Sequence, residues 1–441
     1  MGRWTTTDHN QNSSARRTKL NLSKIRTLFF ETTDSLELSR KHRPDYLLVV
    51  LIMALALIGL IVLFSITPAL TNGNDAESLN FMLRQGLFLT IGLVAFFIAS
   101  KIPLDFWRKH GVKVFILAFF VCFILPIMGW LNISLARCTY GACRWYSLGN
   151  IGTFQPAEFL KFGTVLFVAG FLAVRTAQSK LNSIKESLLP LGLITFMSLF
   201  VIVVMQKDLG TGISLVAIVL TQLIIAGVKL KMIFLSIASL SITGIMAILI
   251  APHRLARIAT FLGQGNETAD YHINQAMIAL GSGGMTGRGL GQSVQAFGWL
   301  PEAIHDSIFA ILGETLGFIG LVVIILIFAM LLRRIISKVD FLENTYLRLI
   351  VAGIFGWLVA HVVMNIGAMT YLLPLTGITL PLVSFGGTSM LFIMMSLGVV
   401  FGISRYTLHN KVKLEEGGEH ASSVRGRRFG RPHYTNRSDS R

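Results

Sequence analysis

The sequence predicts an all-α integral membrane protein with ten transmembrane helices. Of its 441 residues, 53% are hydrophobic and only 14% are charged, and the mean hydropathy is +0.66. Soluble domains carry about 25% charged residues, so a single soluble globule is excluded, as are a disordered chain and a collagen-like fibre. The apolar residues form continuous runs of about 20, the length that crosses a bilayer as a helix. The alternating pattern of membrane β-strands is absent from these runs.

Ten apolar runs define the predicted helices. The fifth and sixth are separated only by Gln206, Lys207 and Asp208, a polar turn that favours two helices over one very long one. Residues 1–45 contain no apolar segment behind a basic start, so we expect no cleavable signal peptide. The predicted spans are 46–67, 83–100, 112–131, 157–174, 188–205, 208–227, 232–251, 307–332, 346–372 and 383–404.

The net charge of +17 is interpreted as a topology signal, not as a nucleic-acid surface. Residues 1–45 hold nine Lys and Arg residues, the C-terminal part from Arg405 holds nine and the predicted inner loops hold 13, which leaves eight of the 39 for the other side. This asymmetry predicts that both termini are cytoplasmic. We expect a cytoplasmic tail over 1–45, a membrane domain over 46–408 and a basic, disordered cytoplasmic tail over 409–441. A long outer loop, 252–306, separates the seventh and eighth helices.

Two of the three cysteines lie in the outer loop after the third helix. Cys138 and Cys143 are five residues apart. An extracytoplasmic loop lies in an oxidising environment, so the two cysteines either form a disulfide or remain free thiols, and the sequence does not decide between these alternatives. Zinc needs more ligands than this loop offers. Cys122 lies in an apolar run and is interpreted as a core residue.

Charged residues near the fourth helix are costly in a membrane and attract attention. Glu158 and Lys161 are three apart and share one helix face, either as a structural ion pair or as the lining of a polar cavity. Arg144 and Trp145 lie just upstream. An outward-facing arginine can grip a lipid diphosphate through two hydrogen bonds.

Three further polar residues have competing interpretations. Asp208 opens the sixth helix and fits a helix cap. Glu314 lies about two turns into the eighth helix, where an unpaired charge is expensive. His361 lies inside the ninth helix, where a packing residue is more common than a ligand.

Asp306 lies at the mouth of the eighth helix, at the end of the outer loop. It is either a helix cap or a general base at the boundary of water and lipid. Glu302 and His305 nearby could bind a divalent cation or tune Asp306, although their spacing is not a specific metal signature.

Gly- and Pro-rich segments flank the start of the tenth helix. Irregular backbone at membrane depth is tolerated where it lines a cavity or is buried in protein. Ser384, Gly386 and Gly387 belong to this region, which lacks the Gly-Lys-Ser/Thr of a phosphate-binding loop, so nucleotide binding is not indicated.

Several strings together make the chain resemble the SEDS family, the group of FtsW, RodA and SpoVE. They occur in the family's order across nearly the whole membrane domain. The chain departs from the family's usual pattern at Ile304-His305, Thr315, Phe385 and Thr388. It also departs at His361, where the family usually has Gln. The strings are Arg144-Trp145, 155–161 (QPAEFLK), 208–212 (DLGTG), 283–291 (GGMTGRGLG), 300–303 (LPEA) with Asp306, 313–320, 365–367 (NIG) and 374–389.

The resemblance implies a peptidoglycan glycosyltransferase that polymerises lipid II at the outer face of the plasma membrane. Asp306 would be the catalytic base, and undecaprenyl diphosphate the leaving group. A divalent cation, Mg or Mn, is a candidate cofactor, and no organic cofactor is expected. The substrate and diphosphate cavity would be formed by Arg144, Trp145, Glu158, Lys161, Glu302, His305, Glu314, Ser384, Gly386 and Gly387.

The N-terminal extension and the string 300–303 favour the FtsW branch over RodA. That branch implies a role at the division septum, with a class B penicillin-binding protein and other divisome membrane proteins as partners, and with no nucleic acid. Two alternatives stay open. One is a lipid II flippase, motivated by charges within the spans. The other is a non-catalytic scaffold for the penicillin-binding protein.

Overall fold

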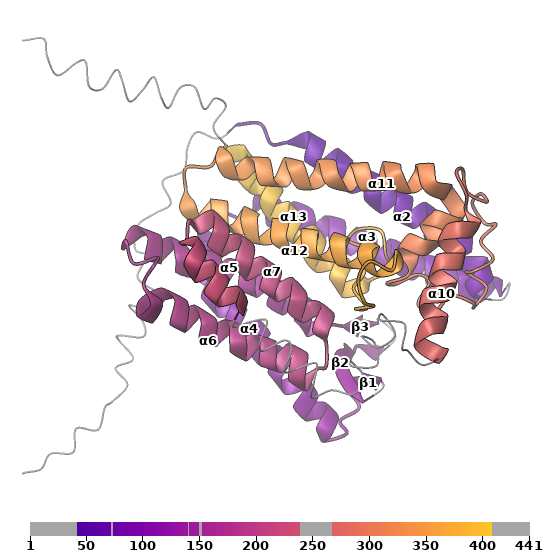
Figure 1. Ribbon diagram of the computed structural model, residues 1–441, viewed down its shortest axis with the longest axis horizontal. Helices are drawn as coiled ribbons and strands as arrows, with labels where there is room; N and C mark the ends of the chain where they lie inside the picture. Colours follow the sequence, from indigo (N-terminus) through magenta and orange to yellow (C-terminus); the bar gives the residue numbers. More distant parts are fainter. Residues whose placement is uncertain (1–41, 72–73, 140, 150–151, 239–266, 408–441) are drawn as a thin grey trace, which may run out of the picture. The chain divides into compact units, whose positions relative to one another are not determined.

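A computed structural model describes residues 42–71, 74–139, 141–149, 152–238 and 267–407. Within these ranges, nine helices are long and apolar enough to cross a membrane (Figure 1). They are α2 (Tyr46–Leu70), α3 (Asp75–Lys101), α4 (Leu104–Trp130), α5 (Pro156–Ala177), the span formed by η2 (Ile184–Leu188), α6 (Leu189–Leu199) and η3 (Phe200–Met205), α7 (Leu209–Ala226), α11 (Ile308–Asp340), α12 (Thr345–Met369) and α13 (Gly387–Ile403), the last continued by the short η4 (Ser404–Tyr406).

The remaining predicted span, 232–251, lies largely outside the described residues. Its first part, 230–238, is helical. The predicted tails 1–45 and 409–441 and the segment 252–266 of the outer loop also fall wholly or mostly outside the described ranges. The count of ten spans and the cytoplasmic position of both termini therefore remain predictions.

The ends of several helices differ from the predicted ones, because hydropathy detects only the apolar part of a helix. α3 begins at Asp75, eight residues before the predicted 83, and Asn74 caps it by accepting hydrogen bonds from two backbone N–H groups. α11 continues to Asp340 through a basic last section. α13 begins at Gly387 instead of 383, because residues 383–386 belong to the loop that precedes it.

Two elements outside the spans add detail to the predicted helical membrane fold. A small antiparallel sheet, in the order β1-β2-β3, follows α4; its strands β1 (Ala136–Thr139), β2 (Ala142–Ser147) and β3 (Thr153–Phe154) are too short to show a periodic pattern. The loop predicted over 252–306 contains the helix α10 (Glu267–Ser282), which packs against α11. Ile273, Ala276 and Ala279, spaced by three, form the buried face of α10.

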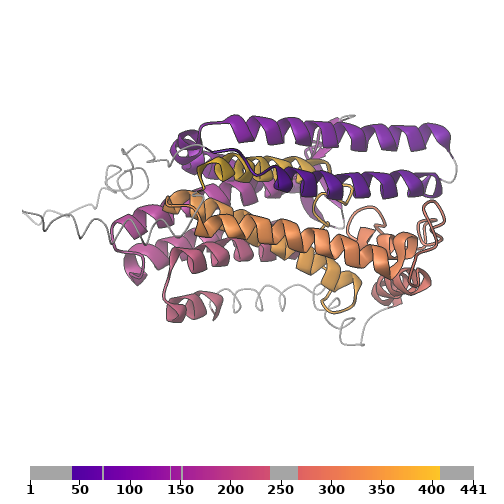
Figure 2. The same ribbon diagram turned by 90° about the horizontal axis from the view of Figure 1, so that it is seen from above.

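α12 packs against α5, α7, α11 and α13, while α3 pairs with α13 and α4 with α5 (Figures 1 and 2). The α3–α13 contact is close because Gly398 and Gly402 face the α3 backbone. A Cβ on Gly402 would lie 3.0 Å from the carbonyl oxygen of Ser100, and a Cβ on Gly398 would collide with that of Phe96. Small residues four apart permit such approach between membrane helices. In α5 and α12 more than 70% of the spanning residues are buried, whereas in α3 and α4 fewer than 30% are.

Candidate functional site

Asp306 lies in the turn before α11, and its side chain is partly exposed. The N-cap residue of α11 is Ser307, so Asp306 precedes the cap position; the Ser307 side chain makes no capping hydrogen bond to the helix. The Ser307 hydroxyl donates to the carbonyl oxygen of Pro301 at 2.8 Å and lies 2.8 Å from Nε2 of His272 in α10. The backbone N–H groups of His305 and Ser307 both donate to the carbonyl oxygen of Glu302. The turn that carries Asp306 is therefore fixed from within.

The same turn is tied to the segment 374–386, which precedes α13. Asn365 of α12 donates from Nδ2 to the carbonyl oxygens of both Asp306 and Ile378, each at 2.7 Å. The N–H of Phe385 donates to the carbonyl oxygen of Ile304 at 2.8 Å. Through its Nδ1–H, His305 donates to the carbonyl oxygen of Phe385 at 2.9 Å. These bonds hold two loops, 301–306 and 374–386, in one register.

Gly377 lies next to the carboxylate of Asp306 and has no side chain to cover it. A Cβ at Gly377 would lie 3.8 Å from Oδ2 of Asp306, and Gly377 has a φ of 73°, in the left-handed region that favours glycine. A partly exposed carboxylate on a rigid turn can accept a proton from a hydroxyl that reaches it.

Glu158 and Lys161 form a buried ion pair at 2.7 Å, and they lie in α5 as predicted. Lys161 is 1% exposed, and its Nζ also lies 2.9 Å from Nε2 of His361 in α12. The indole N–H of Trp357 donates to the same Nε2 at 3.0 Å. His361 therefore accepts at Nε2 and donates from Nδ1 to the carbonyl oxygen of Thr379 at 3.3 Å. This polar cluster connects α5 and α12 with the segment 374–386.

Arg144 is occupied by backbone contacts. Its Nε donates to the carbonyl oxygen of Gln206 at 3.2 Å, and its Nη2 to that of Lys207 at 2.6 Å. These contacts hold the turn between η3 and α7 against β2. Trp145, half-buried on β2, pairs with Arg137 across the sheet.

Cys138 and Cys143 face each other across the β1–β2 hairpin and are joined by a disulfide. The disulfide lies against the end of α4, where a Cβ on Gly129 would meet the sulfur of Cys138 at 2.9 Å. The hairpin that carries Arg144 is thereby closed covalently and packed onto α4.

Glu314 is fully buried in α11 and is surrounded by hydrogen-bond donors. Its carboxylate accepts from the Ser293 hydroxyl at 2.6 Å, from the N–H of Val294 at 2.9 Å and from the N–H of Gln295 at 3.3 Å. Nε of the half-exposed Arg288 lies 3.9 Å from Oε1. The structure thus places Glu314 against residues 293–295, which follow the Gly-rich loop 283–291, and these side-chain bonds do not reach the Asp306 turn.

The Gly-rich loop packs backbone to backbone on a break in α11. Gly317 has a φ of 70°, outside the helical range, and beyond it the N–H of Phe318 donates to the carbonyl oxygen of Gly284 and that of Ile319 to Met285. A Cβ on Gly317 or Gly287 would collide with the opposite backbone. The Gly-rich loop 283–291 therefore packs against α11.

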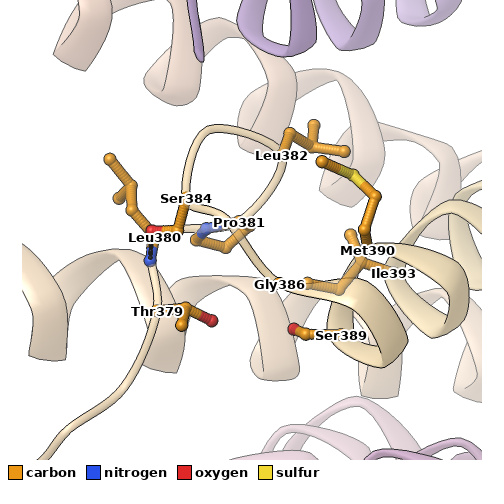
Figure 3. A pocket seen from close by; sticks show the side chains of 9 residues that line it. All are labelled: Thr379, Leu380, Pro381, Leu382, Ser384, Gly386, Ser389, Met390 and Ile393. Atoms are coloured by element: carbon orange, nitrogen blue, oxygen red, sulfur yellow. Dashed lines mark hydrogen bonds between the residues drawn. The ribbon is translucent and has the colours of Figure 1, made fainter. Parts of the chain in front are cut away.

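A small pocket of about 10 Å³ lies between the segment 379–384 and the first turns of α13 (Figure 3). Two of the three residues predicted in this region, Ser384 and Gly386, line it. The Ser384 hydroxyl accepts from the N–H of Leu380 at 2.8 Å and so closes the preceding turn. Gly387, the third, lies against the ring of Phe88, which a Cβ would contact at 2.8 Å.

Glu302 and His305 lie beside Asp306; Glu302 is exposed and His305 is partly exposed, with Oε2 and Nε2 3.9 Å apart. Within the described residues, no three His, Cys, Asp or Glu side chains come together as a metal site. A divalent cation therefore remains a prediction.

Sequence reasoning missed Asn365 and Ser389 as site residues. Asn365 was part of a family-like string, and a lone amide in an apolar helix is a usable signal because it must find partners. Ser389 gave no signal of its own, since serine is common in membrane helices.

Comparison with known proteins identifies relatives for almost the entire membrane domain. Residues 45–409 match the FtsW/RodA/SpoVE family model, described as cell cycle protein. Stage V sporulation protein E of Bacillus subtilis is 35% identical over 84% of this chain and 99% of that protein. A probable peptidoglycan glycosyltransferase FtsW of Coxiella burnetii is 30% identical over 82% of this chain and 96% of that protein.

Two solved structures share the fold at 22% identity. One belongs to a study of polymerization and crosslinking by a peptidoglycan synthase complex, with a TM-score of 0.66 over 83% of this chain and 99% of that chain. The other is the rod shape determining protein RodA of Thermus thermophilus, with a TM-score of 0.59 over 83% of this chain and 98% of that chain. Together with the apolar helices, these matches identify a multi-pass bacterial membrane protein. The chain belongs to the FtsW/RodA/SpoVE family, also called the SEDS family.

Proposed function

We propose that this chain is a peptidoglycan glycosyltransferase that polymerises lipid II at the outer face of the plasma membrane. The observation that carries the proposal is the Asp306 turn: a partly exposed carboxylate on a backbone that Asn365 and the segment 374–386 hold in place. Relatives named as probable peptidoglycan glycosyltransferases support the reaction class.

Asp306 acts as the general base. The acceptor sugar brings its 4-hydroxyl to the carboxylate, which takes the proton as the oxygen attacks the anomeric carbon of the donor. The bond from that carbon to the diphosphate breaks, and its electron pair leaves with the phosphate oxygen. Both substrates keep their lipid tails in the bilayer, which holds their head groups at the same depth and raises their effective concentration.

The proposed setting is septal wall synthesis with a class B penicillin-binding protein as the crosslinking partner. The fold shared with a chain from a peptidoglycan synthase complex supports a partner of this kind. An outward position of Asp306 is what the charge asymmetry predicts, since it predicts that both tails are cytoplasmic.

The test is polymerisation of lipid II by the purified chain, with and without a class B partner, for the wild type and Asp306→Asn. We expect glycan from the wild type and a loss of about 100- to 10,000-fold in the variant, the range for removing a general base. Head-group translocation in sealed vesicles without polymerisation would favour a flippase. An Asp306→Asn variant that supports wall synthesis normally would favour a scaffold.

A further inference from the structure

A departing diphosphate needs hydrogen-bond donors, and the two cations expected to supply them are engaged elsewhere. Arg144 holds the carbonyl oxygens of Gln206 and Lys207. Lys161 is 1% exposed and is held by Glu158 and His361. Other donors near Asp306 therefore have to be considered.

The pocket at the start of α13 presents an unsatisfied donor. The side chain of Ser389 is 9% exposed, and its Oγ has no hydrogen-bond partner within the described residues. Figure 3 shows the hydroxyl oxygens of Ser389 and Thr379 pointing toward each other across the pocket. Leaving a buried hydroxyl unpaired is costly, so this hydroxyl is suited to a polar ligand that enters the pocket.

The backbone around Ser389 favours an anion. Ser389 is the third residue of α13, a helix of 17 residues. The first N–H groups of a helix have no acceptor within it and carry a partial positive charge. The N-cap residue is Gly386, which has no side chain to satisfy them, and the first turn contains no acidic residue. A Cβ on Gly386 would lie 3.5 Å from the Cβ of Ser389, so the glycine leaves space beside Ser389.

The pocket is also next to the proposed general base. Its wall begins at Thr379, two residues after Gly377, which borders the carboxylate of Asp306. On the other side, Phe385 precedes Gly386 and is hydrogen-bonded to the turn that carries Asp306. A phosphate at the start of α13 and a sugar hydroxyl at Asp306 would thus occupy neighbouring places on one rigid assembly.

From this geometry we propose that the N-terminus of α13, Gly386–Ser389, binds a phosphate group of the donor's lipid diphosphate, with the Ser389 hydroxyl as a direct donor. The inference rests on the proposed function. As the anomeric carbon–oxygen bond breaks, the electron pair moves onto the phosphate oxygen, and the helix N–H groups with Ser389 stabilise that charge. Ser389 is then a substrate-binding residue, and Arg144 and Lys161 are structural.

The test is binding of farnesyl diphosphate, a short-chain lipid diphosphate, to the purified full chain in detergent, measured by calorimetry. Ser389→Ala should weaken binding about ten-fold, equivalent to about 1.4 kcal/mol, and Ser389→Val, which fills the pocket, should weaken it further. Ser396→Ala is the matched control, because Ser396 is buried in the same helix and bonds only to its own helix carbonyl at Phe392. It should bind as the wild type does.

Farnesyl monophosphate and farnesol separate phosphate recognition from lipid binding. We expect the monophosphate to bind more weakly and farnesol to be insensitive to Ser389. Unchanged diphosphate binding in Ser389→Ala, or an equal loss of farnesol binding, would overturn the inference. If Ser389→Val does not fold, Ser389→Ala decides. A chain that makes no glycan but binds the diphosphate through Ser389 would refute the proposed polymerase and leave this site standing.

Discussion

Two carboxylates eight residues apart, Asp306 and Glu314, occupy opposite environments. Glu314 is fully buried and accepts hydrogen bonds from a hydroxyl and two backbone N–H groups of residues 293–295. Asp306 is partly exposed, and Asn365 donates a hydrogen bond to its backbone carbonyl oxygen. One carboxylate holds a loop onto a helix, and the other is presented by a loop.

The sequence alone therefore does not show whether a charged residue in a membrane protein has a structural or a catalytic role. A buried charge in a membrane protein must be satisfied, and Glu314 is satisfied by donors that come from 19 to 21 residues away. In the proposed function, the catalytic carboxylate is that of Asp306, whose backbone is held by Asn365 and whose side chain is partly exposed.

The largest effect is expected for Glu314→Ala. It leaves the Ser293 hydroxyl and the N–H groups of Val294 and Gln295 buried without their acceptor, at a cost of roughly 3–5 kcal/mol of folding stability. Thermal unfolding in detergent measures this. Glu314→Gln keeps one acceptor oxygen and should lose less; equal stability of all three proteins would show that the buried bonds contribute nothing.

Asn365→Leu should separate the backbone anchor from the fold. It removes the donor to the carbonyl oxygens of Asp306 and Ile378, and a displaced catalytic group costs about 10- to 100-fold in kcat. The matched control is Gln222→Leu, because Gln222 also bridges two carbonyl oxygens, those of Val165 and Leu349, away from the site. The control should lower the melting temperature but leave kcat of the folded protein intact; an identical kcat loss in both would refute the anchor.

A third carboxylate, that of Asp45 at the N-terminus of α2, belongs to a residue that is held through both its backbone and its side chain. Its backbone N–H donates to the Ser404 hydroxyl, and its carboxylate pairs with Arg334 at 2.7 Å and with Lys338. Burial alone would raise the pKa of Asp45, but hydrogen bonds and charges from Lys338 and Arg334 outweigh it and lower the pKa below its ordinary value of 3.8.

A lowered pKa in the folded protein means that the pair stabilises it above the ordinary pKa and that this stability is lost as the pH falls through the folded value. The melting temperature of the wild type should therefore exceed that of Asp45→Asn at pH 7, and the gap should narrow as the pH falls below 3.8, the ordinary pKa, and through the lowered pKa of the folded protein. A gap that widens on acidification would contradict this assignment.

The smallest effect is expected for Arg288→Ala. Nε of this half-exposed arginine lies 3.9 Å from Glu314, and such pairs contribute about 1 kcal/mol or less. Unfolding of Arg288→Ala should resemble the wild type, and its residual salt dependence should be weaker. A loss as large as that of Glu314→Ala would mean that the charge pair, not the loop donors, holds Glu314.

Hydropathy predicted the nine described spans because burial in lipid demands long apolar runs, whatever the tertiary fold. It could not give the start of α3 or α13, which are set by a cap at Asn74 and by the loop before Gly387. Nor could it find α10, whose buried face of Ile273, Ala276 and Ala279 has meaning only against α11.

The candidate site was predictable where chemistry is local. Asp306 stood out as a carboxylate at a helix mouth, and the pair of Glu158 and Lys161 followed from helical spacing. The partners of Arg144 could not be predicted, because they are backbone carbonyls more than 60 residues away. The role of Ser389 depends on which groups fail to reach it, and only a structure supplies that information.

The most direct test of the account compares Asp306→Asn and Glu314→Gln in the same two assays, lipid II polymerisation and thermal unfolding. The account predicts that Asp306→Asn polymerises lipid II about 100- to 10,000-fold more slowly at an unchanged melting temperature. Glu314→Gln should melt earlier and still polymerise below that temperature. Glycan synthesis at the wild-type rate by folded Asp306→Asn would contradict the account.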